Sequence, residues 1–219
     1  MLFGPLRVPG RCAEMPPHRP GRDPAEEPSH RASTRPKGRP ALIDRDAVLA
    51  AGLAIADERG LEAVTMQAVA DRLEVTPMAL YRHVANKADL LDGLVERLLT
   101  EFPQPSADLP WDQRLAGLAQ AVHRSARRHP AVFPLLLQRP ATTPGAREVR
   151  EGIYRGLREA GVGADRIARI ERLTSTAILG FAVSEAAGRF AKHARRELDA
   201  DFDLLQHMLR DFIEAEACR

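Results

Sequence analysis

Hydrophobic residues recur at helical spacing along most of the chain from residue 41 onward. Asp44 can cap a first helix whose small and apolar residues follow the helical period, and Gly60 can end it. Thr65 can cap a second, short helix. Its apolar residues fall at i, i+3, i+4 and i+7, and they are Met66, Val69, Ala70 and Leu73.

Two further helices follow closely. Thr76 precedes Pro77, which suits the first position of a third helix, and Asn86 can cap a fourth that has Asp89 in its first turn. The pattern therefore predicts four helices within about sixty residues, of which the second and third are very short.

The second half of the chain continues the helical pattern after the link PQPSADLP. An apolar stripe starts at Trp111 and is interrupted at His129 and Pro130, and the segments FPLLLQRP and ATTPG predict a loop-rich middle. A helix closed by Gly161, a long helix over 167–190 and a last helix complete the chain. There is no βαβ alternation and no internal repeat, so the predicted fold class is all-α.

Composition divides the chain into three parts. Residues 1–40 hold nine prolines and eight Arg or Lys against four acids, which predicts a disordered arm. Residues 41–100 hold the short helices, and residues 101–219 form a second helical domain. Met15 is an alternative start of the protein, because nothing before it has a structural pattern.

Bulk properties restrict the function only weakly. The net charge is +2 and the sequence pI is about 8.8, so binding to nucleic acid has to be argued from local features. Cys12 and Cys218 lie in opposite tails, as expected of incidental thiols in a reducing compartment. No signal peptide and no membrane-spanning run is apparent, so we expect a cytoplasmic protein.

The third helix has two distinct faces. Leu80 and Val84 share one face with Pro77, whereas Met78 and Arg82 point the opposite way. Two short helices joined by a tight turn are the geometry of a helix-turn-helix, whose second helix enters the DNA major groove by its N-terminal residues. The sequence therefore predicts a DNA-reading unit.

The residues of this unit divide into two groups. Phosphate contacts are expected from Thr76, Tyr81, His83 and Lys87, and the residues nearest the base edges are Pro77, Met78, Ala79 and Arg82. Thr65 is first of all a helix cap that can also contact phosphate. The basic residues Arg35, Lys37 and Arg39 end the arm; they are either a solvated tail or a second DNA contact.

The segment TMQAVADRLEVTPMALYRHVANKADLLDGLVERLL resembles the DNA-binding domain of the TetR family of bacterial transcription regulators, within which it is most similar to the tetracycline-repressor branch. The resemblance covers about Ala41 to Thr100. It implies an N-terminal three-helix DNA-binding domain, a connecting fourth helix, and a helical ligand-binding and dimerisation domain. It also implies a homodimer on a palindromic operator in double-stranded DNA, usually a repressor released by a small-molecule effector.

The chain departs from the family pattern at two points. Glu74 stands where the family usually has Gly in the turn, which costs about 1 kcal/mol in a left-handed conformation. The tetracycline repressors hold their metal-bound drug with a His in the ligand domain, and the comparable AVFPLLLQRP has none. The resemblance therefore does not extend to a tetracycline–magnesium ligand.

Candidate effector contacts are aromatic or polar residues of the second domain, although such residues at helical spacing are more often core. They are Trp111, His123, Phe133, Leu137, Tyr154, Arg172, Phe181 and Glu185. His123 and His129 lie six positions apart with no Cys or carboxylate cluster, so we expect structural histidines and no metal or cofactor.

Candidate dimer contacts are small residues near the end of the long helix and apolar residues of the last helix, with intrachain packing as the alternative. They are Gly180, Ala182, Ala186, Ala187, Gly188, Phe202, Leu205, Leu209 and Phe212.

Other functions are less well supported by the sequence. An enzyme would need a nucleophile–base pair, and only Ser125 near His129 offers one, by coincidence of spacing. An activator, or an interaction module that keeps the helix-turn-helix as a scaffold, remains an alternative to the repressor.

Overall fold

The structure is a computed structural model that describes residues 43–102, 106, 108–139 and 143–218. These residues form α-helices, one short 3-10 helix and no strand, which confirms the predicted all-α class. The elements are α1 (Arg45–Arg59), η1 (Leu61–Ala63), α2 (Met66–Arg72), α3 (Pro77–Leu80), α4 (Lys87–Thr100), α5 (Trp111–Arg128), α6 (Leu135–Gln138), α7 (Pro144–Glu159), α8 (Ile167–Ala186) and α9 (Arg195–Ala217). The predicted arm, with Arg35, Lys37 and Arg39, lies outside the described residues.

Side-chain caps fix where several helices begin. Asp44, Thr65, Asn86 and Thr143 each accept a hydrogen bond from the amide three residues further on, at 2.7 to 3.2 Å. Each bond satisfies an amide that has no partner inside its helix, so the cap sets the first turn. The caps predicted at Asp44, Thr65 and Asn86 are confirmed.

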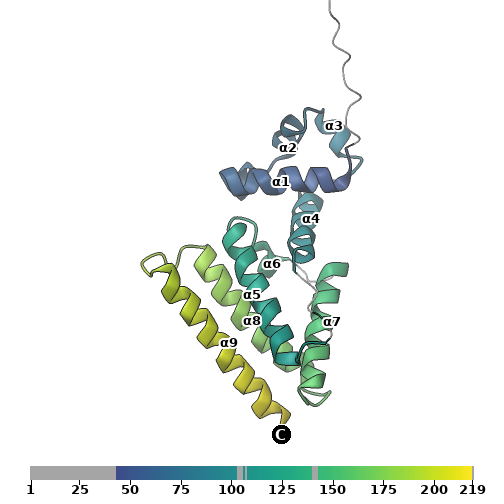
Figure 1. The fold of residues 1–219 in the computed structure, drawn as a ribbon. Helices are drawn as coiled ribbons and strands as arrows, with labels where there is room; N and C mark the ends of the chain where they lie inside the picture. Colours follow the sequence, from purple (N-terminus) through teal and green to yellow (C-terminus); the bar gives the residue numbers. More distant parts are fainter. Residues whose placement is uncertain (1–42, 103–105, 107, 140–142, 219) are drawn as a thin grey trace, which may run out of the picture. The chain divides into compact units, whose positions relative to one another are not determined.

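One main hydrophobic core runs through both halves of the residues from Ala41 onward. α1 packs on α2 and α4, while α5 packs on α7, α8 and α9 (Figure 1). Ile55, Leu94, Phe133 and Phe202 are among its fully buried side chains. Burying each such side chain contributes about 1.5–3 kcal/mol before the entropy of ordering is counted.

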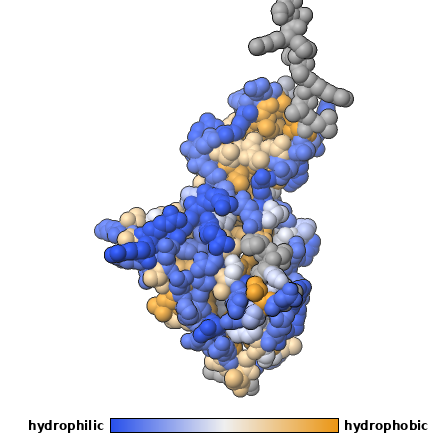
Figure 2. Space-filling view, in the orientation of Figure 1, coloured by the Kyte–Doolittle hydropathy of each residue, from blue (hydrophilic) through white to orange (hydrophobic). Residues whose placement is uncertain are grey.

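A second, smaller cluster closes the far end of the C-terminal helices. It joins Leu157 of α7, Ile170 of α8 and Ile213 of α9. On the surface, Figure 2 shows mostly hydrophilic residues, with hydrophobic ones gathered over the part formed by α1–α4.

Two predicted elements need correction. The loop-rich middle contains the four-residue helix α6, in which Leu135 packs into the core. The long helix ends at Ala186 and not at Phe190, because Gly188 adopts a left-handed φ of +75° that stops helical hydrogen bonding.

Candidate functional site

The turn between α2 and α3 has the tight geometry of a helix-turn-helix. The amide of Val75 donates to the carbonyl of Ala70 at 3.0 Å, and that of Glu74 to the carbonyl of Asp71 at 3.2 Å. Glu74 itself has a φ of +56°, the region that favours glycine. The turn thus forms without glycine, as expected, at a local cost of about 1 kcal/mol.

The segment after the turn is anchored by one face and exposed on the other. Leu80 and Val84 are almost completely buried, while Met78 is 74% exposed and Tyr81 is 50% exposed. A large apolar side chain held in solvent in this way is available to a partner surface.

The helical part of this segment is shorter than the apolar pattern suggests. α3 spans only Pro77–Leu80, and the chain from Tyr81 to His83 forms turns. In these turns the amide of His83 donates to the carbonyl of Leu80, three residues back, and the amide of Ala85 then donates to the carboxylate of Asp89 instead of to a helical carbonyl.

The candidate DNA contacts lie mostly on the exposed side of this unit. Thr65, Thr76, Arg82 and Lys87 are exposed like Met78 and Tyr81, while Pro77, Ala79 and His83 are half-buried. The Thr76 hydroxyl makes no capping hydrogen bond, although Thr76 is the N-cap of α3 by position. Within the described residues, Arg82 and Lys87 form no ion pair that would occupy their charge.

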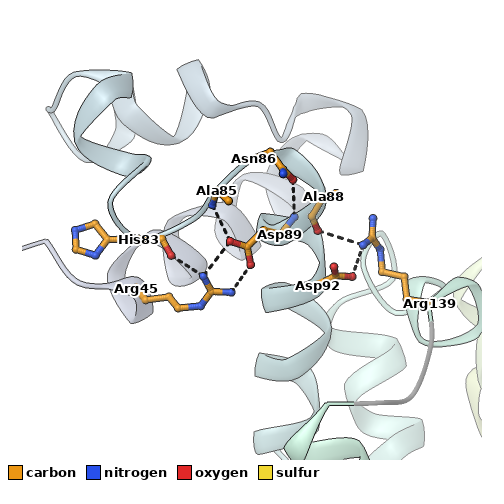
Figure 3. A network of polar contacts seen from close by, with 8 residues as sticks. All are labelled: Arg45, His83, Ala85, Asn86, Ala88, Asp89, Asp92 and Arg139. Carbon is orange, nitrogen blue, oxygen red and sulfur yellow. Dashed lines mark hydrogen bonds and ion pairs between the residues drawn. The ribbon is translucent and has the colours of Figure 1, made fainter.

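A polar network behind the recognition segment (Thr76–Val84) fixes its end. Arg45 of α1 donates to the backbone carbonyl of His83 at 2.5 Å and pairs with Asp89 of α4 at 2.7 Å (Figure 3). Asp89 also accepts the Ala85 amide at 2.7 Å. One carboxylate thus ties α1, α4 and the recognition segment together.

The protonation of this network follows from its hydrogen bonds. The hydrogen bond from Arg45, followed by that from the Ala85 amide, holds the pKa of Asp89 below its usual range. The same hydrogen bond raises the pKa of Arg45. Both groups are therefore charged at neutral pH.

α4 is also tied to the C-terminal helices. Arg139, just after α6, pairs with Asp92 and donates to the carbonyl of Ala88 at 3.1 Å (Figure 3). Further along α4, Glu96 accepts the amide of Gly145 at the start of α7 at 2.8 Å. α4 is therefore held on one side by α1 and on the other by Arg139 and the start of α7.

Buried His129 forms a third tie. Its Nδ1 lies 2.8 Å from Asp57 of α1, and its Nε2 lies 3.4 Å from Glu101 at the end of α4. Ser125, which precedes it by one helical turn, is buried with no hydrogen bond at its hydroxyl. His129 is a structural histidine here, and no Ser–His pair is formed.

α4 and the C-terminal helices line a partly open cavity of about 540 Å³, a size that suits a drug-sized molecule. Its lining is mostly apolar and comes from α4, α5, α6, α7, α8 and α9. Apolar lining residues include Leu99, Phe102, Trp111, Leu115, Leu118, Val149, Ile153, Ile178 and Ile213. α4 thus lines the cavity near its end and contacts α1 near its start.

The candidate effector residues are only partly placed at this cavity. Trp111 lines it, but the other seven do not. Phe133 is buried in the main core, Leu137 and Arg172 are exposed, and Tyr154 packs on the second cluster. The lining residues that sequence reasoning missed are mainly aliphatic ones such as Val149 and Ile153, which look like ordinary core in a helical pattern.

His123, Phe181 and Glu185 belong instead to a buried cluster between α5, α8 and α9. The His123 ring stacks on Phe202 with centroids 3.9 Å apart, and its Nε2 lies 2.5 Å from Glu185. Arg127 donates to the same carboxylate at 2.7 Å. Burial alone raises the pKa of Glu185, but these hydrogen bonds outweigh it and the pKa is lowered.

The candidate dimer residues divide in a similar way. Ala182 and Phe202 are fully buried within the chain, so they pack internally, and Leu209 lines the cavity. The cause is that α8 and α9 turn these positions toward α5. Gly180, Ala186, Leu205 and Phe212 are half-buried, while Ala187 and Gly188 are exposed.

The same helices also carry exposed apolar side chains that the sequence analysis did not include among the candidate dimer contacts. Leu173 of α8 is 51% exposed, and Leu204 and Met208 of α9 are 59% and 60% exposed. Leu204 and Met208 are four residues apart and therefore share one face of α9.

In the described part of the chain, no group of three or more His, Cys, Asp or Glu is placed to hold a metal ion. None of the helices described is both long and apolar enough to cross a membrane.

The fold and its helix-turn-helix agree with two family models. The model for bacterial regulatory proteins of the tetR family matches residues 48–94, and the model for the tetracyclin repressor-like C-terminal domain matches residues 102–212. The chain belongs to the TetR family. The expected resemblance is confirmed, and residues 48–94 lie in the family's helix-turn-helix domain.

Individual relatives agree with this assignment. The chain is 29% identical to the HTH-type transcriptional repressor DrrR1 of Streptomyces coeruleorubidus, over 76% of this chain and 62% of that protein. It is 32% identical to the tetracycline repressor protein class E of Escherichia coli, over 67% of this chain and 71% of that protein. The chain thus spans less than two thirds of DrrR1, and the relatives it matches are transcriptional regulators.

A solved structure of the same fold is that of BioQ from Mycobacterium smegmatis. The TM-score is 0.69 at 27% identity, over 80% of this chain and 99% of that chain. BioQ has also been solved with its double-stranded DNA operator.

Proposed function

We propose that this TetR family protein is a sequence-specific DNA-binding transcriptional regulator, and that it is a repressor which a small-molecule effector releases from DNA. The observation that carries the proposal is the recognition segment. Its Leu80 and Val84 are buried as anchors, while Met78, Tyr81 and Arg82 are held in solvent. The relatives described as repressors and the operator complex of BioQ support the same function.

The exposed residues take separate roles in the proposed complex. Pro77, Met78, Ala79 and Arg82 lie at the base edges of the major groove, where a bidentate arginine discriminates guanine. Phosphates are contacted by Thr65, Thr76, Tyr81, His83 and Lys87, which position the segment without reading sequence. Arg35, Lys37 and Arg39 add a salt-dependent contact with the DNA backbone or minor groove.

The effector site in this proposal is the cavity of about 540 Å³. Its apolar lining suits a largely hydrophobic small molecule. α4 both lines the cavity and holds the end of the recognition segment through Asp89, so a ligand that moves α4 changes the DNA-binding surface.

The working form in this proposal is a cytoplasmic homodimer. Leu173 of α8 and Leu204 and Met208 of α9 are exposed apolar side chains on two neighbouring helices, and in this proposal a second copy covers them. A two-fold dimer then presents two recognition segments about 34–36 Å apart, one turn of DNA. Catalysis is no part of this function.

The decisive experiment is selection of bound sequences from a random duplex library by the purified protein at physiological salt. An enriched palindrome with half-sites one turn apart is expected. Tyr81→Ala and Lys87→Ala are the test variants, and Arg147→Gln, an exposed arginine of α7, is the control. Failure of any sequence to be enriched contradicts the proposal and favours the interaction module.

The sign of regulation needs a second measurement. A promoter that carries the selected palindrome is placed before a reporter gene, with and without the protein. Lower expression in the presence of the protein is expected for a repressor, and higher expression identifies an activator.

A further inference from the structure

The charged residues that line the cavity are not equally neutralised. Asp203 accepts hydrogen bonds from Gln120 and Gln206, and Glu171 accepts one from Ser175. The third acid, Asp112, lies in the first turn of α5, where the helix dipole favours a carboxylate. The lining acids therefore already have favourable partners or surroundings.

The lining arginines differ from one another. Arg210 pairs with Asp211 and Glu214 on its own helix. Arg150 of α7 is half-buried and, within the described residues, forms no hydrogen bond or ion pair. A half-buried arginine without a carboxylate favours an anionic group beside it.

Arg139 is the third lining arginine, and its partners lie on α4. One of its nitrogens, Nη1, serves both the carboxylate of Asp92 and the carbonyl of Ala88, at 3.1 Å for the latter (Figure 3). A guanidinium has five N–H donors, so the contacts with the described residues leave most of them unused. The side chain remains 22% exposed.

The partners of Arg139 are one helical turn from the network that holds the recognition segment. Asp92 is three residues after Asp89, and Ala88 is directly before it. Asp89 binds Arg45 and the Ala85 amide, and Arg45 donates to the carbonyl of His83. A shift of the first turns of α4 therefore changes where the recognition segment ends.

From these contacts we propose that the effector is an apolar acid, and that its anionic group draws Arg139 away from Asp92 and the Ala88 carbonyl. Arg150 attracts the same anion into the cavity. α4 then loses the contact that holds its first turns on the C-terminal side, and the position of the recognition segment changes. Arg139 acts as a positioning residue, because it affects DNA only through α4.

Competition for one guanidinium explains why binding and release are coupled. An anion held inside an apolar cavity has lost part of its hydration, so leaving it unpaired costs more than leaving a carboxylate near solvent unpaired. The Asp92 side chain is 52% exposed, and water can replace Arg139 there at little cost. The exchange therefore favours the bound acid.

Two fluorescent probes with the same aromatic frame test this inference, which rests on the proposed effector cavity. Anilinonaphthalene sulfonate carries an anionic group, and N-phenylnaphthylamine carries none. Titration of the full chain with each probe gives two dissociation constants. We expect Arg139→Gln to weaken sulfonate binding on the order of tenfold, and Asp92→Asn to strengthen it, because Asp92 no longer competes for Arg139. Binding of the uncharged probe is expected to stay unchanged in both variants.

Two further variants sharpen the titration. Arg150→Gln is expected to weaken binding of the sulfonate probe. Once bound, the probe is still expected to dissociate this variant from DNA. Arg147→Gln, which lies outside the cavity lining on the same helix, is the matched control and is expected to bind both probes as the parent does.

The DNA readout separates positioning from simple ligand binding. On the selected duplex, the sulfonate probe is expected to dissociate the parent protein, whereas the uncharged probe is not. For Arg139→Gln, DNA binding is expected to be the same with a saturating concentration of the sulfonate probe as without the probe. Circular dichroism of each variant checks that the helical fold is kept.

The possible failures are distinguishable. If both probes bind the cavity and their affinities respond alike to the charge variants, the effector is not an acid that acts through Arg139. The proposal that the cavity is the effector site is then kept. If neither probe binds, the cavity is not an effector site, and that part of the proposed function fails together with this inference. DNA binding is tested separately by the sequence selection.

Discussion

Asp89 is the residue on which the end of the recognition segment depends. Its carboxylate accepts hydrogen bonds from Arg45 of α1 and from the Ala85 amide, while Asn86 caps the helix that begins beside it. Removing the charge takes away the carboxylate that Arg45 pairs with in the described part of the chain, while the carbonyl of His83 still accepts a hydrogen bond from it. The orientation of the exposed DNA contacts therefore rests on one partly exposed ion pair.

Replacing Asp89 by Asn tests this dependence. At neutral pH we expect the free energy of unfolding to fall by about 1–2 kcal/mol, a modest loss because the pair is partly screened by solvent. The hydrogen bond from Arg45 lowers the pKa of Asp89. Its stabilisation is therefore present above the ordinary aspartate pKa and is lost as the pH falls through the lowered value. Urea unfolding of parent and variant over a descending pH series measures the difference.

The expected difference between parent and Asp89→Asn shrinks toward zero in acid. Asp165→Asn, which changes an exposed carboxylate before α8, is the control and is expected to leave stability unchanged. A difference that stays constant over the whole pH series would contradict the role of the charge.

Arg82 and Lys87 are both exposed cations, but they are placed differently in the proposed complex. If Arg82 reads a base, Arg82→Ala costs about 1–3 kcal/mol on the preferred duplex and relaxes the sequence preference. Lys87→Ala weakens all duplexes alike and lowers the salt dependence of binding. Dissociation constants on preferred and scrambled duplexes measure both effects. Equal, sequence-independent losses from the two variants would sink the base-reading role of Arg82.

Among elements, α1 and α4 pack closely together at Gly93. A Cβ atom built there would lie 2.4 Å from Leu49 Cδ2, and the whole branched end of Leu49 lies within 3.3 Å. Leu49 is buried and has little room to move. The absence of a side chain at Gly93 is therefore what lets the two helices pack.

A pair of Gly→Ala variants tests this packing. Gly93→Ala is expected to lower stability by about 1–3 kcal/mol, because overpacking outweighs the gain in helix propensity. Gly152→Ala, on the open face of α7 with no atom within 4 Å, is the matched control and should raise stability by about 0.5–1 kcal/mol. Thermal unfolding of both variants gives the comparison, and a stabilised Gly93→Ala would show that α1 and α4 can separate freely.

The elements themselves show which features the sequence could predict. Helix starts at Asp44, Thr65 and Asn86 were predictable because a cap acts within three residues of itself. The end of α8 was missed, although Gly188 gave a local signal for it.

Of the candidate sites, the recognition segment could be predicted from the sequence, but the cavity and its link to α4 could not. The two faces of the recognition segment followed from helical periodicity, and the burial of Leu80 and Val84 agrees with it. The cavity lining comes from six separate helices, and the contacts of Arg139 and Arg45 join residues 38 to 51 positions apart. No local pattern encodes such distant contacts, so they required the structure.

At the scale of the whole molecule, DNA affinity depends on how many recognition segments act together. A single copy presents one segment, whereas a two-fold dimer presents two about one DNA turn apart. The second contact is then intramolecular, which raises the overall affinity by orders of magnitude. A variant that only prevents dimerisation is therefore expected to lose operator binding while its helix-turn-helix stays folded.

Leu204→Asp is the variant expected to prevent dimerisation, because a charge in an apolar interface is costly while the same charge in solvent is not. Leu204 is 59% exposed on α9, so the change leaves the core of the single chain intact. We expect sedimentation equilibrium to show dimers for the parent and monomers for the variant, with a matching loss of palindrome binding. Leu137→Asp, on α6 and 51% exposed, is the matched control and is expected to remain dimeric. If both variants stay dimeric and bind DNA as the parent does, the surface of α8 and α9 around Leu204 is not the dimer interface.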